Sequence, residues 1–270
     1  MIGKQQETKQ ELAKQLGISR ASLYYVSKQL PKDWELKRKI EEVLAQHPAY
    51  GYRRAAIALQ INKKRIQRVM RLFGMRAYRR RGRKYRKIKR KTSRAYPNLL
   101  KETIPLHPNH IWAADFTYLP YQEKFFYLAT VMDCFTREIV GWALMNNHSV
   151  PLILQALFVA LNSHSRPRIF HSDNGREYGS KAFISVLEEL TIQISRSAPG
   201  CPWQNGYQES FYSQFKMDLG DTNRFKTLGE LAYAVYRTVW EYNHSRIHSS
   251  LKMPPLLFAE RYQKLLEKMS

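Results

Sequence analysis

The chain has 270 residues, of which 44% are hydrophobic, enough for one large domain or for two to three small ones. Its first ten residues are mostly polar and contain no apolar run, and its longest apolar stretch, residues 150–161, is too short to cross a bilayer. We therefore expect no signal peptide and no membrane segment. The two cysteines, Cys134 and Cys201, indicate a reducing compartment and no disulfide framework.

The positive charge is concentrated in the first part of the chain. Of the net charge of +23, residues 1–108 carry 29 lysines and arginines against 7 acids, whereas residues 109–270 carry 16 against 15. A basic block of this size predicts a polyanionic partner, with nucleic acid favoured over an anionic membrane surface. The nearly neutral remainder predicts a separate globular domain with its own function.

Residues 6–28 have the pattern of two short helices around a turn at Gly17, and Ser19 can cap the second helix. The spacing resembles a DNA-binding helix-turn-helix, with residues 19–28 as the recognition helix and Arg20 as a DNA contact. The alternative is an ordinary helical hairpin. The basic surroundings favour DNA binding.

A second basic segment follows, in which apolar stripes predict three helices between residues 34 and 73. The cations that we expect to bind DNA in this segment are Arg53, Arg54, Lys64, Arg65 and Arg68. Residues 78–91 then hold ten lysines or arginines in fourteen positions, a composition that cannot pack as a core. Interleaved tyrosines favour an arm on DNA over a solvated linker.

From residue 109 onwards the pattern changes to strands alternating with helices. We expect three strands, the last two joined by a turn at residues 133–137, and then helix, strand, helix, strand and a loop rich in proline and glycine. A helix from about Tyr207 to Leu219 and a long helix from about Leu228 to His244 follow. This order is typical of an α/β domain with a mixed sheet.

Two aspartates occupy unusual places in these strands. Asp173 lies in FHSDNGREY, where an expected strand ends at an Asn-Gly turn, and a lone acid there is usually a solvated turn residue. Asp115, however, lies inside the apolar strand IWAADFTYL, where an acid is costly unless it is paired or binds a cation. If the two strands are neighbours, both aspartates reach one edge of the sheet.

Glu209 follows Asp173 with thirty-five residues between them. At 100° per residue, Glu209 and Lys216 point to the same side of the expected helix, opposite an aromatic stripe. Alone, Glu209 would be a surface acid. Together with Asp115 and Asp173 it offers hard oxygen ligands, which select Mg²⁺ or Mn²⁺. Two such ions can activate a nucleophile and stabilise a leaving oxygen in phosphoryl transfer.

Three stretches carry these acids in order: WAADFTY, HSDNGREY and SAPGCPWQNGYQESFYSQFK. Together they resemble the DDE integrases and transposases, including the spacing between the second aspartate and the glutamate. The stretches YNHSRIHSSLKMPP and YGYRRAAIALQINKKRIQRVMRLFGMRA make the chain similar to the integrase-core protein that insertion sequences of the IS-three family encode in their second reading frame. The resemblance covers roughly residues 50–255.

This resemblance implies an α/β fold with an RNase H-like integrase core, a mixed sheet with flanking helices, preceded by small all-helical DNA-binding segments. It implies that Asp115, Asp173 and Glu209 are catalytic and hold two Mg²⁺ or Mn²⁺ ions, and that Lys216 lies near a DNA phosphate. The implied activity is DNA transposition: the chain binds the ends of its insertion sequence, cleaves the 3′ ends and transfers the strands, without a covalent enzyme intermediate.

The implied partners are double-stranded DNA, as terminal inverted repeats and as target, further copies of the chain on DNA, and an upstream-frame protein or fusion. We expect no membrane partner and a location in the bacterial cytoplasm. The expected domains are 1–30 (helix-turn-helix), 31–92 (basic helical segment and arm), 93–108 (linker), 109–225 (catalytic core) and 226–270 (helical extension).

Two other functions are open to such a sequence. The intact acidic triad argues against a DNA-binding regulator with a non-catalytic core, and the DNA-reading segments argue against an RNase H-type nuclease.

Within the site, His171 is a weaker catalytic candidate because metal-activated water needs no side-chain base, and Asp133 fits a hairpin turn. Many relatives carry an aspartate where this chain has Gln204, which puts any role of that acid in doubt. Trp203 remains a candidate for stacking on a DNA base.

Overall fold

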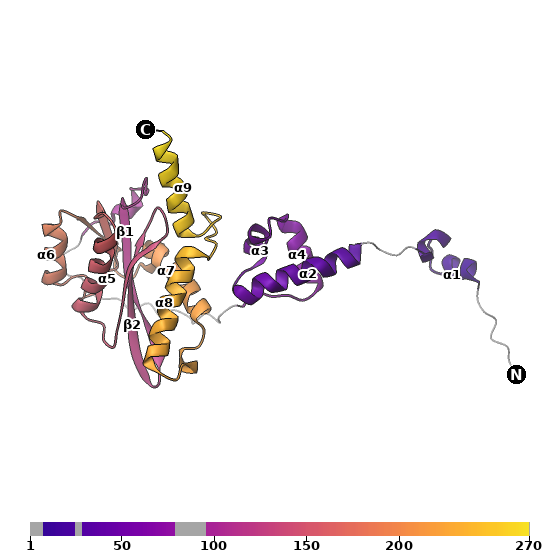
Figure 1. Ribbon diagram of the computed structural model, residues 1–270, viewed down its shortest axis with the longest axis horizontal. Coiled ribbons are helices and arrows are strands. Elements are labelled where there is room, and N and C mark those ends of the chain that lie inside the picture. The colour runs from indigo at the N-terminus through magenta and orange to yellow at the C-terminus, as the bar shows by residue number, and fades with distance from the viewer. Residues whose placement is uncertain (1–7, 25–28, 79–95, 270) are drawn as a thin grey trace.

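The computed structural model describes residues 8–24, 29–78 and 96–269 (Figure 1). Most of the expected basic arm, residues 79–91, lies outside this description. Within the described ranges, no helix is long and apolar enough to cross a membrane.

The first described residues are helical, with one departure from the prediction. Helix α1 (Lys9–Gln15) begins with a capping box. The next element is a short 3₁₀ helix, η1 (Arg20–Tyr24), where the sequence predicted the start of a longer α-helix. The amide of Ser22 donates to the Ser19 hydroxyl at 3.2 Å, so Ser19 caps this tighter turn. The rest of the expected helix, residues 25–28, lies outside the description.

Three further helices form the small bundle that the sequence predicted: α2 (Gln29–Gln46), α3 (Tyr52–Ala58) and α4 (Lys63–Leu72). Its core consists of small and branched side chains: Leu36, Ile40, Ala55, Ala56, Ile66, Val69 and Met70. Buried Asp33 of α2 accepts hydrogen bonds from both terminal nitrogens of Arg68 of α4, one of them at 2.8 Å. This ion pair fixes α4 against α2.

The central element of the chain is a five-stranded mixed sheet in the order β3-β2-β1-β4-β5. Its strands are β1 (Ile111–Tyr121), β2 (Lys124–Asp133), β3 (Ile139–Met145), β4 (Ile169–Ser172) and β5 (Gln193–Arg196). β2 runs antiparallel to both β1 and β3, whereas β4 runs parallel to β1, and β5 parallel to β4. The expected mixed-sheet α/β class is confirmed.

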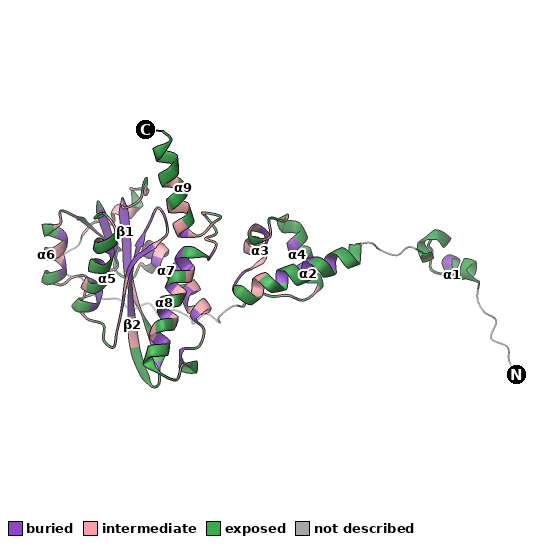
Figure 2. Ribbon diagram, viewed as in Figure 1, coloured by how far each residue is buried: buried purple, intermediate pink, exposed green. Residues whose placement is uncertain are grey.

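Helices cover both faces of this sheet, and its strands are largely buried between them (Figures 1 and 2). On one face lie α5 (Val150–Ser163) and α6 (Lys181–Glu189). On the other lie α7 (Gly206–Leu219) and α8 (Leu228–His244), and α9 (Pro255–Glu267) follows them. The bounds of α7 and α8 agree with the prediction to within one residue.

Short 3₁₀ helices connect the larger elements: η2 (Leu99–Lys101), η3 (Pro202–Asn205) and η4 (Thr222–Arg224). The expected linker runs beside β5, where the amide of Leu99 donates to the Ser195 hydroxyl at 2.9 Å. The linker is therefore tied to the sheet.

Candidate active site

Asp115 on β1 and Asp173, the first residue after β4, occupy equivalent places along two adjacent parallel strands. β1 and β4 pair with Ala113 opposite His171, and each aspartate follows its paired residue by two positions. The backbones of Asp115 and Asp173 therefore lie close together just beyond the end of the β1–β4 pairing, in the middle of the sheet. The expectation that the two strands are neighbours is confirmed, while the catalytic role of the aspartates stays a prediction.

Asp115 lies in a strongly negative environment. Burial, and after it the charges of Asp173 and Glu209, raise the pKa of Asp115 to about 8. The amide of Phe116, which donates to Asp115 Oδ1 at 2.8 Å, and the ammonium of Lys216 act in the opposite direction. The three acids and Lys216 therefore share one electrostatic environment.

Asp173 is held by the turn that follows its strand. The amide of Gly175 donates to Asp173 Oδ1 at 2.9 Å, and a Cβ on Gly175 would come within 2.9 Å of this oxygen. A side chain at Gly175 would therefore displace the carboxylate. Burial raises the pKa of Asp173, the amide bond lowers it, Glu177 raises it and Arg196 lowers it.

Three buried polar side chains fasten the beginning of α7 to β1. Each donates to a main-chain carbonyl of β1: Asn205 to Ala114 at 3.0 Å, Gln208 to Ala113 at 2.6 Å and Tyr212 to Asp115 at 2.7 Å. Because Glu209 follows Gln208, these bonds fix the part of the helix that carries the third acid. The sequence pattern did not predict these bonds. The available signal was a row of polar groups at Asn205, Gln208 and Tyr212, beside the aromatic stripe.

Glu209 and Lys216 lie on the side of α7 that the helical spacing predicted. Glu209 is exposed, and Lys216 is half-buried. The Lys216 ammonium lies 4.8 Å from the ring centroid of Tyr118 on β1, a cation–π distance. This contact directs Lys216 along the strand that also carries Asp115.

The three acids fit a hard divalent cation in donor type and in charge, since carboxylates that repel one another are stabilised by a shared cation. Within the described ranges, no three His, Cys, Asp or Glu side chains lie close enough together to hold a metal ion. The carboxylates of Asp115, Asp173 and Glu209 would therefore have to move towards a bound ion.

His171 has a structural position. Its Nδ1 lies 2.9 Å from the Ser195 hydroxyl and its Nε2 lies 3.1 Å from the Ser197 hydroxyl. Burial lowers the pKa of His171 to about 4. A neutral ring with both nitrogens engaged stabilises the β4–β5 edge and is poorly placed to act as a base.

Asp133 closes the turn between β2 and β3, as the sequence predicted. It is buried, and its Oδ1 accepts hydrogen bonds from the amides of Phe135 at 2.7 Å and Thr136 at 2.9 Å. Its Oδ2 accepts a further bond from the amide of Asn109. These bonds use both carboxylate oxygens locally.

Gln204 links the loop before α7 to the linker. Its Oε1 accepts hydrogen bonds from the Asn98 side chain at 2.8 Å and from the amide of Ala198 at 2.7 Å. Both bonds need only an acceptor, which an amide supplies as an aspartate would. Gln204 therefore stabilises the conformation of this loop.

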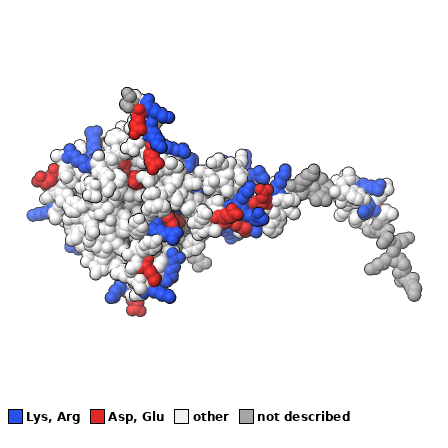
Figure 3. Space-filling model, in the orientation of Figure 1, with Lys and Arg blue, Asp and Glu red and all other residues white. Residues whose placement is uncertain are grey.

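The cations expected to bind DNA differ in their surroundings. The exposed ones are Arg20, Arg53, Lys64 and Arg65, and the helical part of the chain shows lysines and arginines interspersed with acids (Figure 3). Arg68 is exposed but paired with Asp33. Arg54 instead faces the sheet domain, where its Nη1 donates to Gln214 Oε1 at 3.1 Å.

Comparison with known proteins gives relatives over most of the chain. Models of the integrase core domain match residues 105–202 and 190–255. The transposase for insertion sequence element IS904 of Lactococcus lactis is 34% identical over 236 residues, 83% of this chain and 93% of the relative. The putative transposase InsK for insertion sequence element IS150 of Escherichia coli is 30% identical over 255 residues, 90% of this chain and 89% of the relative.

A solved structure shows the same fold. A chain of the simian T-cell lymphotropic virus intasome in complex with PP2A regulatory subunit B56 gamma matches with a TM-score of 0.52 and 19% identity. The match covers 76% of this chain and 70% of that chain. The likeness confirms the expected integrase-core fold.

Proposed function

The chain belongs to the DDE transposases of bacterial insertion sequences, which are enzymes with an integrase core, and we propose that it binds the ends of its own element, cleaves the 3′ strands and joins them to target DNA. One observation carries this proposal. Asp115 on β1 and Asp173, the first residue after β4, occupy equivalent positions along two adjacent parallel strands, and Glu209, from a helix bonded to the first strand, acts electrostatically on Asp115.

In this proposal Asp115, Asp173 and Glu209 hold two divalent ions, Mg²⁺ or Mn²⁺. When bound, these ions supply an activated water or 3′-hydroxyl and stabilise the leaving oxygen. The chain's own groups position the DNA. Lys216 binds a phosphate beside the carboxylates, where it orients the strand without chelating metal.

The helical segments before residue 108 bind the terminal repeats in this proposal. Their charge supports the assignment, since they carry nearly all of the excess positive charge of the chain. The exposed cations Arg20, Arg53, Lys64 and Arg65 are the candidate contacts, and residues 79–91 add further charge. The partners proposed are element ends, target DNA, further copies of the chain and an upstream-frame protein or fusion, in the bacterial cytoplasm.

A single assay distinguishes this function from its alternatives. The full chain is incubated with Mg²⁺ and a labelled duplex that carries an inverted repeat from the DNA flanking the reading frame. We expect a nick at the 3′ end of the element, followed by longer products in which the end is joined to other DNA. Binding without nicking would instead indicate a regulator, and degradation of RNA–DNA hybrids would indicate a nuclease.

A further inference from the structure

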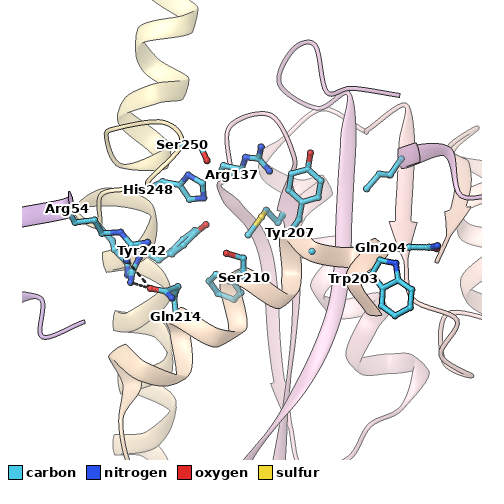
Figure 4. Close-up of a pocket in the computed structure, with 15 residues that line it drawn as sticks. Arg54, Arg137, Trp203, Gln204, Tyr207, Ser210, Gln214, Tyr242, His248 and Ser250 are labelled. Carbon is cyan, nitrogen blue, oxygen red and sulfur yellow. Dashed lines mark hydrogen bonds between the residues drawn. The ribbon is translucent and has the colours of Figure 1, made fainter. Parts of the chain in front are cut away.

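A cavity of about 400 Å³ lies against α7 (Figure 4), and Glu209 is not among the residues that line it. Among its lining residues are Arg54, Arg137, Arg246 and His248, and we refer to it as the arginine pocket. Its walls come from α3, from the turn between β2 and β3, from α7 and from the segment after α8. Segments that are distant in the sequence therefore line one site.

The wall that α3 contributes is held in place by polar contacts. The amide of Ile247 donates to the Tyr50 hydroxyl at 2.7 Å, and Arg54 Nη1 donates to Gln214 Oε1 at 3.1 Å. Tyr50 is buried. These bonds join the helical bundle to α7 and to the segment after α8, so the pocket has a defined shape.

The pocket carries positive charge without a matching negative charge. Its lining includes three arginines and no carboxylate. Buried Arg246 is neutralised from outside the lining, where its Nε bonds Asp218 Oδ2 at 2.5 Å. Arg54 and Arg137 form no ion pair with any residue that the structure describes. Two cationic groups are thus left for an anionic occupant.

Buried polar atoms in this lining also have no partner. Nε of Arg54, Nε of Arg137 and Nδ1 of His248 make no hydrogen bond with a described residue. Buried polar atoms in proteins are almost always hydrogen-bonded, to protein, water or ligand. All three atoms belong to residues that line one cavity, and the two guanidinium groups among these residues favour a negatively charged occupant.

The backbone at Arg137 points to a specific use of this arginine. Its φ is 66°, in the left-handed region where Gly and Asn are favoured and a long side chain is uncommon. Its guanidinium carbon lies 4.2 Å from the ring centroid of Tyr207 on α7. The turn thus places an arginine, at some conformational cost, over the first turn of the helix that carries Glu209.

The pKa of His248 depends on the electrostatic potential inside the pocket. Burial, and after it the charges of Arg137, Arg54 and Arg246, lower the pKa of His248 to about 4. An anion in the pocket would offset those charges and raise this pKa. A rise in the pKa of His248 would therefore indicate that an anion occupies the pocket.

We propose that the arginine pocket binds a backbone phosphate of the DNA strand that passes α7 beside the carboxylates, with Arg137 and Arg54 as its ligands. Ser210 and Gln214, which line the pocket, lie roughly 100° and 140° around α7 from Glu209. The pocket is thus about one helix diameter, about 10 Å, from the acid, or about three nucleotide rises of 3.4 Å.

The rim of the pocket favours a nucleotide over a free anion or an acidic side chain. Trp203 lines the pocket and is 62% exposed, so its side chain offers aromatic surface to a base. With Lys216 on the other side of α7, the strand would contact positive charge on both flanks of the helix. The inference rests on the proposed function and extends it by naming a second phosphate contact.

The test measures the binding of an element-end duplex by the full chain across a range of salt concentrations. Arg137→Asn removes the charge but suits the left-handed backbone, so the fold is retained. We expect this variant to bind several-fold more weakly and to reduce the slope of log K against log salt by about 0.9, the contribution of one phosphate. Arg137→Lys should keep most of the slope. Arg54→Gln provides an independent second variant.

The matched control is Arg237→Gln, which removes an exposed arginine that is paired with Glu241 on α8. It should leave binding unchanged. Duplexes with one neutral methylphosphonate then locate the contact. At one position, neutralisation should weaken binding by the native chain but not by Arg137→Asn. Equal slopes for the native chain and Arg137→Asn, with native binding intact, would overturn the phosphate assignment and leave the proposed function standing. Failure of the native chain to bind the ends would overturn both.

A second readout uses inorganic phosphate and the His248 ring, identified in NMR spectra by its loss in His248→Gln. Phosphate should raise the pKa of His248 in the native chain and leave it unchanged in Arg137→Asn. The element-end duplex should produce the same rise. A response to inorganic phosphate but not to the duplex would overturn the strand assignment. No response to either would mean that water fills the pocket, and would overturn the proposal.

Discussion

The hydroxyl of Tyr212 on α7 donates a hydrogen bond of 2.7 Å to the main-chain carbonyl of Asp115 on β1. The same hydroxyl accepts a bond of 2.8 Å from the side chain of Thr130 on β2. The strand residue that carries one proposed metal ligand is thereby tied to the helix that carries another. The distance between Asp115 and Glu209 depends on this buried connection as well as on helix packing.

Loss of this connection should affect both stability and catalysis. Tyr212→Phe keeps the ring but removes the hydroxyl that bonds the Asp115 carbonyl and Thr130, while Thr130 keeps its bond of 2.9 Å to Gln208 Oε1. We expect the free energy of unfolding to fall by about 1–2 kcal/mol and cleavage to slow by up to about 100-fold, because small displacements of catalytic groups are costly. Denaturant unfolding and end cleavage measure the two effects. Ser213→Ala, at an exposed position on the same helix, is the control and should change neither.

A Tyr212→Phe protein with lower stability but native cleavage would show that the hydroxyl stabilises the fold without positioning Glu209.

Much of the fold could be predicted because it depends on local patterns. The apolar spacing gave the bounds of α7 and α8 to within one residue, and the acid in the turn after β2 was assigned correctly to local hydrogen bonding. The sequence allowed β1 and β4 to be neighbours but did not require it. The pairing of these two strands in the structure establishes that they are.

Other features depend on contacts that no local pattern reveals. The 3₁₀ helix η1 replaces the start of an expected α-helix, with Ser19 closing a tight local turn. The bonds from Gln208 and Tyr212 to β1 could not be seen, because the aromatic stripe of α7 dominates its apolar pattern. The arginine pocket combines Arg54 with Arg137, which lie 83 positions apart in the sequence.

The raised pKa of Asp115 predicts how metal binding and stability depend on pH. The pKa is about 8 in the folded chain and about 3.9 in an unfolded one, so the folded chain holds the extra proton between these values. Without metal, the free energy of unfolding should therefore fall as the pH rises from about 4 to about 8. Asp115→Asn should remove this contribution and be more stable than the native chain at pH 8.

Metal binding should show the same linkage. Because the ion requires the carboxylate form, Mg²⁺ affinity should rise by about tenfold per pH unit below about pH 8 and level off above it. Calorimetry in buffers of different ionisation enthalpy measures the released proton. Affinity that is independent of pH from 6 to 8 would contradict the assignment of Asp115 as a ligand.

Lys216 should bind DNA and not metal. Lys216→Ala removes the ammonium near Asp115, so we expect weaker DNA engagement and slower cleavage at sub-saturating DNA, with Mg²⁺ binding by the free chain retained. Lys216→Arg should keep much of the activity if charge alone matters, and less if the site needs the compact ammonium. Cleavage and joining by Lys216→Ala at the native rate, at moderate salt, would remove Lys216 from the site.

His171 should affect stability rather than chemistry. His171→Gln disturbs the contacts with Ser195 and Ser197, and we expect the free energy of unfolding to fall by about 1–3 kcal/mol. The pH dependence of the cleavage rate should keep its native shape above pH 5, where the ring is already neutral. Loss of cleavage with native stability and native DNA affinity would make His171 a catalytic group after all.

We propose that Asp115, Asp173 and Glu209 form one metal-dependent site. End cleavage and joining in Mg²⁺ by Asp115→Asn, Asp173→Asn and Glu209→Gln tests this assignment. An amide keeps the shape of each side chain but removes the charge that holds a cation. We predict that each variant binds the element end nearly as the native chain does and neither cleaves nor joins it, while Glu189→Gln, an exposed acid on α6, has native activity. Cleavage at near-native rate by any one of the three variants would contradict the account.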